Sequence, residues 1–277
     1  MQHRPLRSVL YVPADKPRAL DKVRGLPVDA VIIDLEDAVA PDAKAAARAA
    51  VADALAGDWG GRLVMLRING ADTPWHEDDR AAARAAGAGT ADRPLLLPKV
   101  DGPDAVPADA VAWAMIETPA GVAAAAAIGA ACDGLVVGTN DLAKDLGTRD
   151  APDRTPLLHA LQATVLGARA AGVPAIDGVY NAFRDEDGLR AECEQGRDWG
   201  FDGKTLIHPA QVAVANAAFG PSDEEVDLAR RRIAAFEAAQ AEGRGVAVLD
   251  GRIVENLHVD SARAILAKSA AIAAREG

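Results

Sequence analysis

Eight short apolar runs, rich in β-branched residues, recur along the first three quarters of the chain. Each is almost continuously hydrophobic, without the strict alternation typical of a strand that has one side in water. Strands buried on both faces have this pattern, and such strands are usually parallel. The predicted strands are Arg7–Pro13, Ala30–Glu36, Arg62–Ile68, Pro94–Val100, Val111–Thr118, Gly134–Thr139, Val173–Val179 and Gly203–His208.

Helical patterns separate most of these strands. They are predicted at Pro41–Gly57, Asp78–Ala86, Pro119–Ala131, Pro156–Gly172 and Asp185–Gly200. Eight strands that alternate with helices predict a (β/α)₈ TIM barrel, which typically needs about 250 residues. A doubly wound sheet is the alternative fold, but no strand is followed by the Gly-x-Gly-x-x-Gly turn of nucleotide-binding sheets.

The pattern changes after the eighth strand. A last barrel helix, a long charged helix, a hairpin and a final amphipathic helix are predicted at Pro209–Ala218, Ser222–Glu242, 246–254 and Asp260–Arg275. Ser222 and Glu225 have the spacing of a capping box, and Asp250-Gly251 between apolar segments is a strong hairpin signal. We therefore expect a barrel over residues 1–220 and a helix–hairpin–helix extension over residues 221–277.

Composition and charge narrow the class of protein. The 277 residues are 50% hydrophobic and 26% charged, with a net charge of −11 at pH 7. This acidity argues against nucleic-acid binding and against a polybasic membrane anchor. Cys132 and Cys193 are too few for a disulfide scaffold, and no apolar run reaches the ~18 residues of a membrane span. We expect a soluble, cytoplasmic protein that binds neither nucleic acid nor membrane.

Charged and amide side chains gather where the predicted strands end. In a (β/α)₈ enzyme the active site lies at the C-terminal ends of the strands, so these side chains are expected to face one another. The opposite ends show no comparable series of carboxylates. In strand order the residues are Asp15, Lys16 and Arg18; Asp34, Glu36 and Asp37; Arg67 and Asn69; Lys99; Glu117; Asn140 and Asp141; Asp177; and His208.

Several carboxylates without clustered His or Cys suit a hard cation. Proteins hold Mg²⁺ through one or two carboxylates, with waters and substrate oxygens as further ligands. Glu117 and Asp141, which end adjacent strands, are the natural pair. Zn²⁺ is disfavoured because the five histidines are scattered. Arg67 would point into the same opening, where a guanidinium suits a carboxylate or a developing enolate oxygen.

Segments along the whole chain carry a family resemblance. They are Ser8–Asp15, Asp29–Asp42, Arg67–Trp75, Leu97–Lys99, Ile116–Thr118, Asn140–Gly147, Ala175–Val179 and Phe201–Gln211. With these segments the sequence resembles the citrate lyase β-subunit-like group of the HpcH/HpaI aldolase/citrate lyase family, which includes malyl-CoA and citramalyl-CoA lyases.

The resemblance implies a (β/α)₈ barrel that uses Mg²⁺, acts on acyl-CoA thioesters and usually assembles as a homotrimer or hexamer. By position, Glu117 and Asp141 are implied to bind Mg²⁺, and Arg67 to contact the substrate. Glu36 and Asp37 are implied to orient metal-bound waters. Residues implied to lie near the CoA are Lys16, Arg18 and the backbone of Asp177 and Gly178.

The resemblance also gives the C-terminal extension a role. In the family this segment often covers a neighbouring subunit's site and delivers a catalytic Asp a few residues after an Asp-Gly-Lys turn. Here the turn ends in Arg252, and Glu255 stands at the Asp position with a side chain one methylene longer. Because a misplacement of about 1 Å can cost ~10²-fold in rate, the change indicates a different substrate, a weaker lyase or a repurposed site.

Four functions fit these residues. The leading one is a Mg²⁺-dependent carbon–carbon lyase that cleaves a malyl-CoA, citramalyl-CoA or citryl-CoA type of thioester into acetyl-CoA and a 2-oxo acid, or runs the reverse condensation. In the synthetic direction Glu255 would deprotonate the acetyl-CoA methyl group and Arg67 would stabilise the enolate oxygen. The alternatives are an acyl-CoA thioesterase at the same site, a thioester-binding lyase subunit that is inactive without partners, and an aldolase that uses no CoA.

Overall fold

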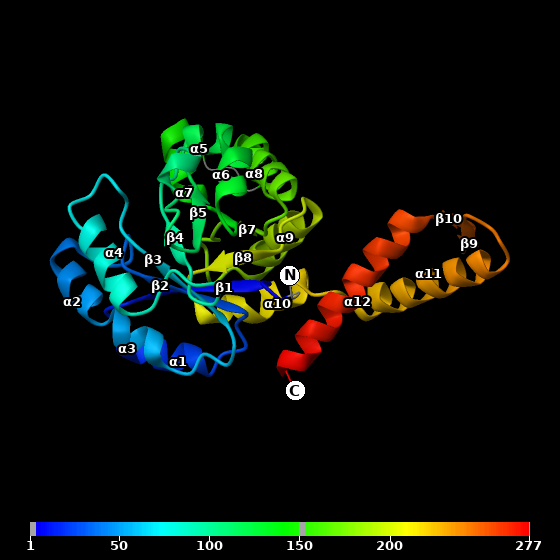
Figure 1. Cartoon of the computed structure of the whole chain (residues 1–277), viewed down its shortest axis with the longest axis horizontal. Helices are drawn as coiled ribbons and strands as arrows, with labels where there is room; N and C mark the ends of the chain where they lie inside the picture. The colour runs from blue at the N-terminus through cyan, green and yellow to red at the C-terminus, as the bar shows by residue number, and fades with distance from the viewer. Residues whose placement is uncertain (1–3, 150–152, 277) are drawn as a thin grey trace. The chain divides into compact units, whose positions relative to one another are not determined.

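Eight parallel strands close into a barrel in the order of the chain (Figure 1). The computed structural model describes residues 4–149 and 153–276. The barrel closes where β8 pairs with β1, through Ser8 and Lys204 among others. The strands are β1 Ser8–Pro13, β2 Ala30–Asp34, β3 Leu63–Arg67, β4 Leu95–Leu97, β5 Ala112–Ile116, β6 Leu135–Val137, β7 Ala175–Asp177 and β8 Gly203–Leu206. All eight predicted strands and the (β/α)₈ fold are confirmed.

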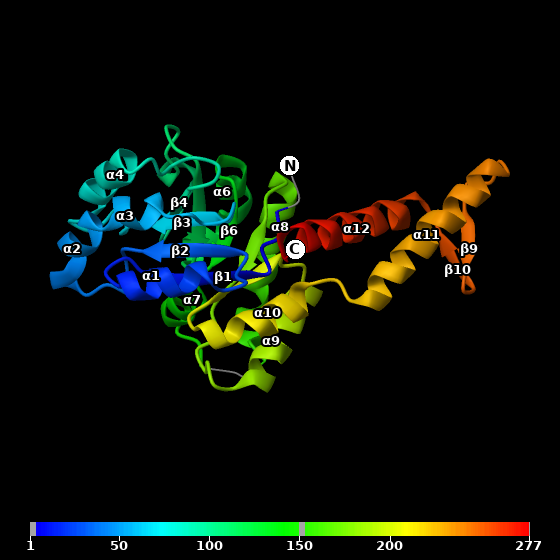
Figure 2. The same ribbon diagram turned by 90° about the horizontal axis from the view of Figure 1, so that it is seen from below.

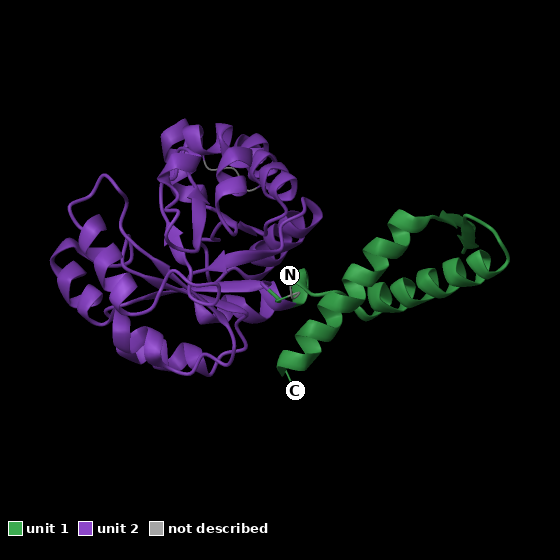
Figure 3. Ribbon diagram, in the orientation of Figure 1, with its two compact units in different colours: residues 1–5, 217–277 green, residues 6–216 purple. Residues whose placement is uncertain are grey.

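The chain divides into two compact units (Figure 3). The barrel unit comprises residues 6–216, and the second unit comprises residues 1–5 and 217–277. None of the described helices combines the length and the apolar character that crossing a membrane requires.

Helices connect the strands of the barrel unit. They are α1 Pro17–Arg24, α2 Lys44–Ala49, α3 Val51–Ala56, α4 His76–Ala85, α5 Pro119–Ala123, α6 Ala125–Ala131, α7 Thr139–Leu146, α8 Leu158–Ala171, α9 Glu186–Asp198 and α10 Val212–Phe219. The prediction of one helix over Pro119–Ala131 was wrong, because Ala124 has ψ near 5° and separates α5 from α6. The Pro41–Gly57 segment likewise consists of a 3₁₀ turn, Pro41–Ala43, followed by α2 and α3.

Two helices, α1 and α7, follow their strands directly and were not predicted. Each has eight residues and buries only two side chains, Leu20 and Val23 in α1 and Thr139 and Leu142 in α7. Both helices begin within four residues of the strand before them, so the sequence shows no separate helical segment after the strand.

The barrel interior is filled by alternate residues of the strands. Val9, Ile32, Met65, Trp113 and Met115 belong to this core cluster and are at most 4% exposed. The residues between them, such as Ile33 and Leu66, are equally buried because they face the surrounding helices. Burial on both faces accounts for the continuous apolar runs in the sequence.

The second unit is a helix–hairpin–helix with a small core of its own. Its elements are α11 Asp223–Ala241, β9 Ala247–Leu249, β10 Arg252–Val254 and α12 Asn256–Glu276. The helices α11 and α12 pack against each other (Figure 1 and Figure 2). Phe236, Ala247, Val254 and Val259 are buried between these elements.

Local signals in the second unit are confirmed. Ser222 and Glu225 form the predicted capping box at the start of α11. Asp250 and Gly251 both have positive φ, 49° and 74°, as a tight hairpin turn requires. The final helix begins four residues earlier than predicted, at Asn256.

Candidate active site

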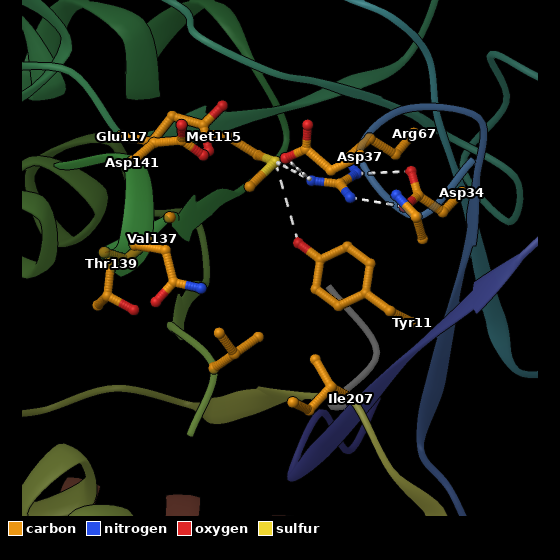
Figure 4. A pocket seen from close by; sticks show the side chains of 14 residues that line it. Tyr11, Asp34, Asp37, Arg67, Met115, Glu117, Val137, Thr139, Asp141 and Ile207 are labelled. Carbon is orange, nitrogen blue, oxygen red and sulfur yellow. Dashed lines mark hydrogen bonds and ion pairs between the residues drawn. The ribbon is translucent and has the colours of Figure 1, made fainter. Parts of the chain in front are cut away.

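A cavity of about 290 Å³ opens at the C-terminal ends of the barrel strands (Figure 4). Residues from β1, β2, β3, β5 and β6 line it, together with the segments that follow β2, β5, β6, β7 and β8. The lining residues are Tyr11, Asp34, Asp37, Ala38, Arg67, Met115, Glu117, Val137, Gly138, Thr139, Asn140, Asp141, Val179 and Ile207. Of the predicted site residues, Arg67, Asp37, Glu117 and Asp141 are therefore brought together.

Arg67, at the end of β3, is held by carboxylates from the neighbouring strand. Its Nε and Nη2 donate to the two oxygens of Asp34 at 2.7 and 2.6 Å, and its Nη1 lies 2.8 Å from Oε2 of Glu36. Burial alone would lower the pKa of Arg67, but Asp34 and the other neighbours raise it well above its usual value. The guanidinium is fixed as a permanent positive charge at the edge of the cavity, with most of its donors engaged by protein.

Glu117 follows β5 and is 1% exposed. The backbone N–H of Lys99, a residue with a positive φ of 52°, donates to its Oε1 at 2.7 Å. A side chain at Gly138 would overlap Glu117, so glycine at this position leaves the space that the carboxylate occupies. Burial, with Glu36 adding to it, raises the pKa of Glu117 to about 8. The carboxylate is thus placed firmly but is short of positive charge.

Asp141 lies in the first turn of α7, the helix that follows β6. It lines the cavity with Glu117, and Figure 4 shows the two side chains next to each other. The N-terminal end of a helix favours a negative side chain.

Glu36 and Asp37 follow β2 and lie close to the guanidinium of Arg67. Burial raises the pKa of Glu36 to about 7, although Arg67 opposes the shift. Oε2 of Glu36 is buried, and despite its proximity to Arg67 it has no hydrogen-bond partner with suitable angles among the described residues. Asp37 is more open, with a side chain 61% exposed and an oxygen 3.8 Å from Nη1 of Arg67.

The charges in and beside this cavity do not balance. Within the part of the chain that the structure describes, the five carboxylates of Asp34, Glu36, Asp37, Glu117 and Asp141 meet three cations, Arg67, Lys99 and the buried Lys44. Buried carboxylates with raised pKa values and an unpartnered oxygen fit a bound divalent cation.

The donor set favours Mg²⁺ over Zn²⁺. Residues 4–149 and 153–276 contain no group of three or more His, Cys, Asp or Glu side chains placed to hold a metal. Mg²⁺ accepts two carboxylates and completes its shell with waters and substrate oxygens, whereas Zn²⁺ takes three or four protein ligands. Glu117 and Asp141 are therefore the residues that would hold Mg²⁺.

The two cations predicted to lie near CoA are on the surface. Lys16 immediately precedes α1, is 60% exposed and pairs with Asp15 at 2.7 Å. Arg18, in α1, is also exposed. Neither residue lines the cavity.

Asp177 is fully buried at the end of β7 and faces away from the cavity. Its carboxylate accepts from Arg154 at 2.8 Å and from Lys204 at 3.0 Å, and also from the backbone N–H of Gly178. Gly178 lies against Thr139, which a Cβ at position 178 would overlap. The Asp177 side chain therefore holds the end of β7 in place. The absence of a side chain at Gly178 allows Thr139, in the cavity wall, to pack closely against it.

Glu255 belongs to the second unit, between β10 and α12. It is exposed, and its backbone N–H donates to Nδ1 of His258 at 3.0 Å. Three apolar side chains around it are more than half exposed: Val248 and Ile253, which are cross-strand partners in the hairpin, and Leu257.

Tyr11 and Met115 are cavity residues that the sequence reasoning missed. Both lie within strands, while the search was confined to polar residues at strand ends. The available signal was periodicity, since Tyr11 is two residues from the inward-facing Val9 and must share its face.

Three comparisons agree on the relationships of this chain. The model of the HpcH/HpaI aldolase/citrate lyase family matches residues 7–113 and 107–209. A (3S)-malyl-CoA thioesterase of Cereibacter sphaeroides is 54% identical over 99% of this chain and 98% of its own length. An L-malyl-CoA/beta-methylmalyl-CoA lyase of the same species is 33% identical over 98% of this chain and 96% of its own length.

Solved structures of two bacterial proteins are similar to this chain. The protein CitE from Mycobacterium tuberculosis, solved with magnesium, acetoacetate and coenzyme A, superposes with a TM-score of 0.83 and 32% identity over 97% of this chain and 99% of that chain. RipC from Yersinia pestis superposes with a TM-score of 0.67 and 30% sequence identity, over 82% of this chain and 100% of that chain.

Proposed function

The chain belongs to the HpcH/HpaI aldolase/citrate lyase family, and we propose that it is a Mg²⁺-dependent enzyme that hydrolyses a malyl-CoA type of thioester to malate and CoA. The family acts on CoA thioesters. The observation that carries the proposal is the ring of carboxylates around Arg67 in a chain 54% identical to malyl-CoA thioesterases. The carbon–carbon lyase reaction, placed first by the sequence analysis, is the second candidate, supported by the 33% identical lyases.

The residues of the cavity have separate tasks in this proposal. Glu117 and Asp141 would hold Mg²⁺, which when bound would supply Lewis acidity to the oxygens of the acyl group. Arg67, kept in place by Asp34, provides a fixed positive charge toward the acyl oxygens. Glu36 and Asp37 accept hydrogen bonds from waters in the cavity and orient them.

The hydrolysis needs a base, and we assign that role to Glu255. Its carboxylate takes a proton from water as the oxygen attacks the thioester carbonyl carbon. The carbon–sulfur bond then breaks, and the proton passes to the departing CoA sulfur. We assign the CoA phosphates to Arg18 and to Lys16, whose charge Asp15 partly offsets, and the thioester arm to the Asp177-Gly178 backbone.

Product analysis tests the proposal directly. Purified protein is incubated with Mg²⁺ and (3S)-malyl-CoA, and the products are identified by mass spectrometry, with a parallel sample containing a chelator. Free CoA and malate, formed only without chelator, support hydrolysis. Acetyl-CoA and glyoxylate would instead establish the lyase, and no turnover of malyl-CoA or citramalyl-CoA would overturn both candidates.

Mg²⁺ binding is expected to weaken as the pH falls below about 8. The metal-free Glu117, with a pKa of about 8, and Glu36, with a pKa of about 7, hold protons that the cation must displace. The affinity should fall by about tenfold per pH unit between pH 8 and 7, and more steeply below 7. Titration calorimetry at pH 6, 7 and 8 measures this, and a pH-independent affinity would contradict it.

The same shifts set the stability of the metal-free barrel. A glutamate whose pKa is raised in the native state stabilises the fold when the pH is below its pKa in the unfolded chain. This stabilisation is lost as the pH rises through its pKa in the native state. Metal-free protein should therefore become less stable between pH 5 and 8. Added Mg²⁺ should raise the melting temperature more at pH 8 than at pH 6.

We propose that Glu255 acts on the cavity of another copy of the chain, in a homotrimer or hexamer. The exposed apolar residues Val248, Ile253 and Leu257 around it give an oligomer contact surface to bury. Glu255→Gln is expected to lower kcat by about 10²-fold or more, because a general base contributes about 10²- to 10⁴-fold.

Mixing two inactive variants tests whether the site is shared. Glu255→Gln and Glu117→Gln proteins, combined under conditions that exchange subunits, should regain part of the wild-type activity. This happens only if one copy supplies Glu255 and the other supplies the metal site. A mixture as inactive as its components would place both residues in one chain, and full activity of Glu255→Gln alone would remove its role as base.

A further inference from the structure

Tyr11 is a partly buried residue of β1 that lines the cavity and carries a hydroxyl donor. Its ring lies under the guanidinium of Arg67, with 4.7 Å from Cζ to the ring centroid. Figure 4 shows the hydroxyl between the carboxylate side of the cavity, with Glu117 and Asp141, and the Arg67–Asp34 pair. Its recorded partner is the sulfur of Met115 at 3.9 Å, which is a weak acceptor.

The other donors at this place are already engaged. Arg67 uses Nε and Nη2 for Asp34, and its Nη1 faces Glu36. A substrate oxygen arriving beside the guanidinium therefore meets its charge, but finds few free N–H groups. The Tyr11 hydroxyl carries a proton that no strong acceptor in the described part of the cavity holds.

The hydroxyl stays protonated at any ordinary pH. Burial raises the pKa of Tyr11 far above its usual value, and Asp34, Glu117 and Glu36 raise it further, although Arg67 opposes them. Tyr11 can therefore donate a hydrogen bond but cannot serve as a base. Because this hydroxyl lines the cavity and has only a thioether as a protein partner, it is placed to donate to an oxygen of a bound ligand.

We propose that Tyr11 is a substrate-binding residue whose hydroxyl donates a hydrogen bond to a carbonyl or carboxylate oxygen of the acyl group. This inference rests on the proposed function. It assigns the recognition of that oxygen to a pair, in which Arg67 supplies the positive charge and Tyr11 supplies the directed donor. One hydrogen bond to a charged or polarised oxygen corresponds to about 10- to 100-fold in kcat/KM.

The test removes a single oxygen atom. Tyr11→Phe should lower kcat/KM for malyl-CoA by about 10- to 100-fold, with an unchanged melting temperature. Tyr180→Phe is the matched control, because Tyr180 donates to Asp185 outside the cavity and should keep wild-type activity. Met115→Leu removes the sulfur that accepts from both the Tyr11 hydroxyl and Nη1 of Arg67, and it should still lose less activity than Tyr11→Phe. Equal losses in these two variants would mean that the hydroxyl only positions Met115, which overturns the inference.

Two further measurements identify the oxygen. Lactate carries the 2-hydroxy acid end of the malyl group and lacks the carbon of the thioester carbonyl. If Tyr11→Phe weakens competitive inhibition by lactate as much as it lowers kcat/KM, the partner is an oxygen of the carboxylate end. If inhibition by lactate is unchanged and kcat falls, the partner is the thioester carbonyl.

Spectroscopy gives a readout that does not depend on turnover. The chain has two tyrosines, so protein labelled with ¹³C at the tyrosine Cζ gives two resonances, assigned by the two Phe variants. Malate with Mg²⁺ should shift the Tyr11 resonance and leave that of Tyr180 in place. No turnover by wild-type protein would overturn the proposed function, whereas turnover that Tyr11→Phe matches would overturn the role of Tyr11.

Discussion

Glu117→Gln is expected to lower turnover of malyl-CoA by at least about 10²- to 10³-fold while the barrel stays folded. The substitution keeps the size of the side chain and can still accept from the Lys99 N–H, but it removes the negative charge that would bind Mg²⁺. Lewis-acid stabilisation of this kind is worth several kcal/mol, and each 1.36 kcal/mol corresponds to tenfold in rate. Calorimetric titration with Mg²⁺ should show the loss of binding that explains the loss of activity.

A stability measurement distinguishes a loss of metal binding in Glu117→Gln from a loss of folding. Wild-type Glu117 must carry a buried charge at high pH, so the metal-free Glu117→Gln protein should melt at the same or a higher temperature than the metal-free wild type at pH 8. Glu77→Gln is the matched control, since this glutamate is 86% exposed on α4. Activity near the wild-type level in Glu117→Gln would remove Glu117 from the metal site.

The strands could be predicted because each is buried on both faces. Ile32 points into the barrel and Ile33 toward the helices, and both are inaccessible to solvent, so the run around them is continuously apolar. The helices α1 and α7 escaped prediction because they are only eight residues long and begin within four residues of the strand before them. The residues Lys16 and Asp141, assigned to strand ends, instead lie at the N-termini of these helices.

The candidate site could be predicted in outline, from polar residues that interrupt apolar runs. The sequence does not tell which of them face the cavity and which face each other. Asn69 is buried in a hydrogen-bond network with Lys44 and Asp79, and His208 caps the 3₁₀ turn that precedes α10. Asp34 proved to be the partner of Arg67, a pairing that only the register of β2 against β3 determines.

The opposite strand ends, where no comparable series of carboxylates was expected, do carry individual carboxylates in ion pairs. Asp29 and Asp202 directly precede β2 and β8, and each forms an ion pair, with Arg7 at 2.8 Å and with Arg169 at 3.0 Å. These pairs have matched charges, whereas the cavity at the other end has an excess of carboxylates. The balance between carboxylates and cations therefore distinguishes the two ends of the barrel better than the presence of carboxylates does. This balance can be judged only from the structure.

Lys204→Met is expected to destabilise the barrel by about 3–5 kcal/mol, because it breaks a buried ion cluster and leaves charges uncompensated. Nζ of Lys204 lies 3.0 Å from Asp177 and 2.6 Å from Glu192, and Arg154 contacts the same two carboxylates. Burial alone would raise the pKa of Asp177, but Lys204 and Arg154 together hold it below its usual value. Without Lys204, one guanidinium faces two carboxylates, of which Asp177 is inaccessible to solvent and Glu192 is 11% exposed.

Urea unfolding followed by tryptophan fluorescence measures this loss in the barrel alone, since all four tryptophans lie within residues 6–216. Lys16→Met is a matched control, because Lys16 also pairs with an aspartate, at 2.7 Å, but is 60% exposed. An exposed pair contributes about 0–1 kcal/mol. The deficit of Lys204→Met should shrink as the pH falls below the usual pKa of an aspartate, because the stabilisation from a lowered pKa is lost on protonation. Equal, small effects of both substitutions would mean that the cluster stabilises the fold no more than a surface pair does.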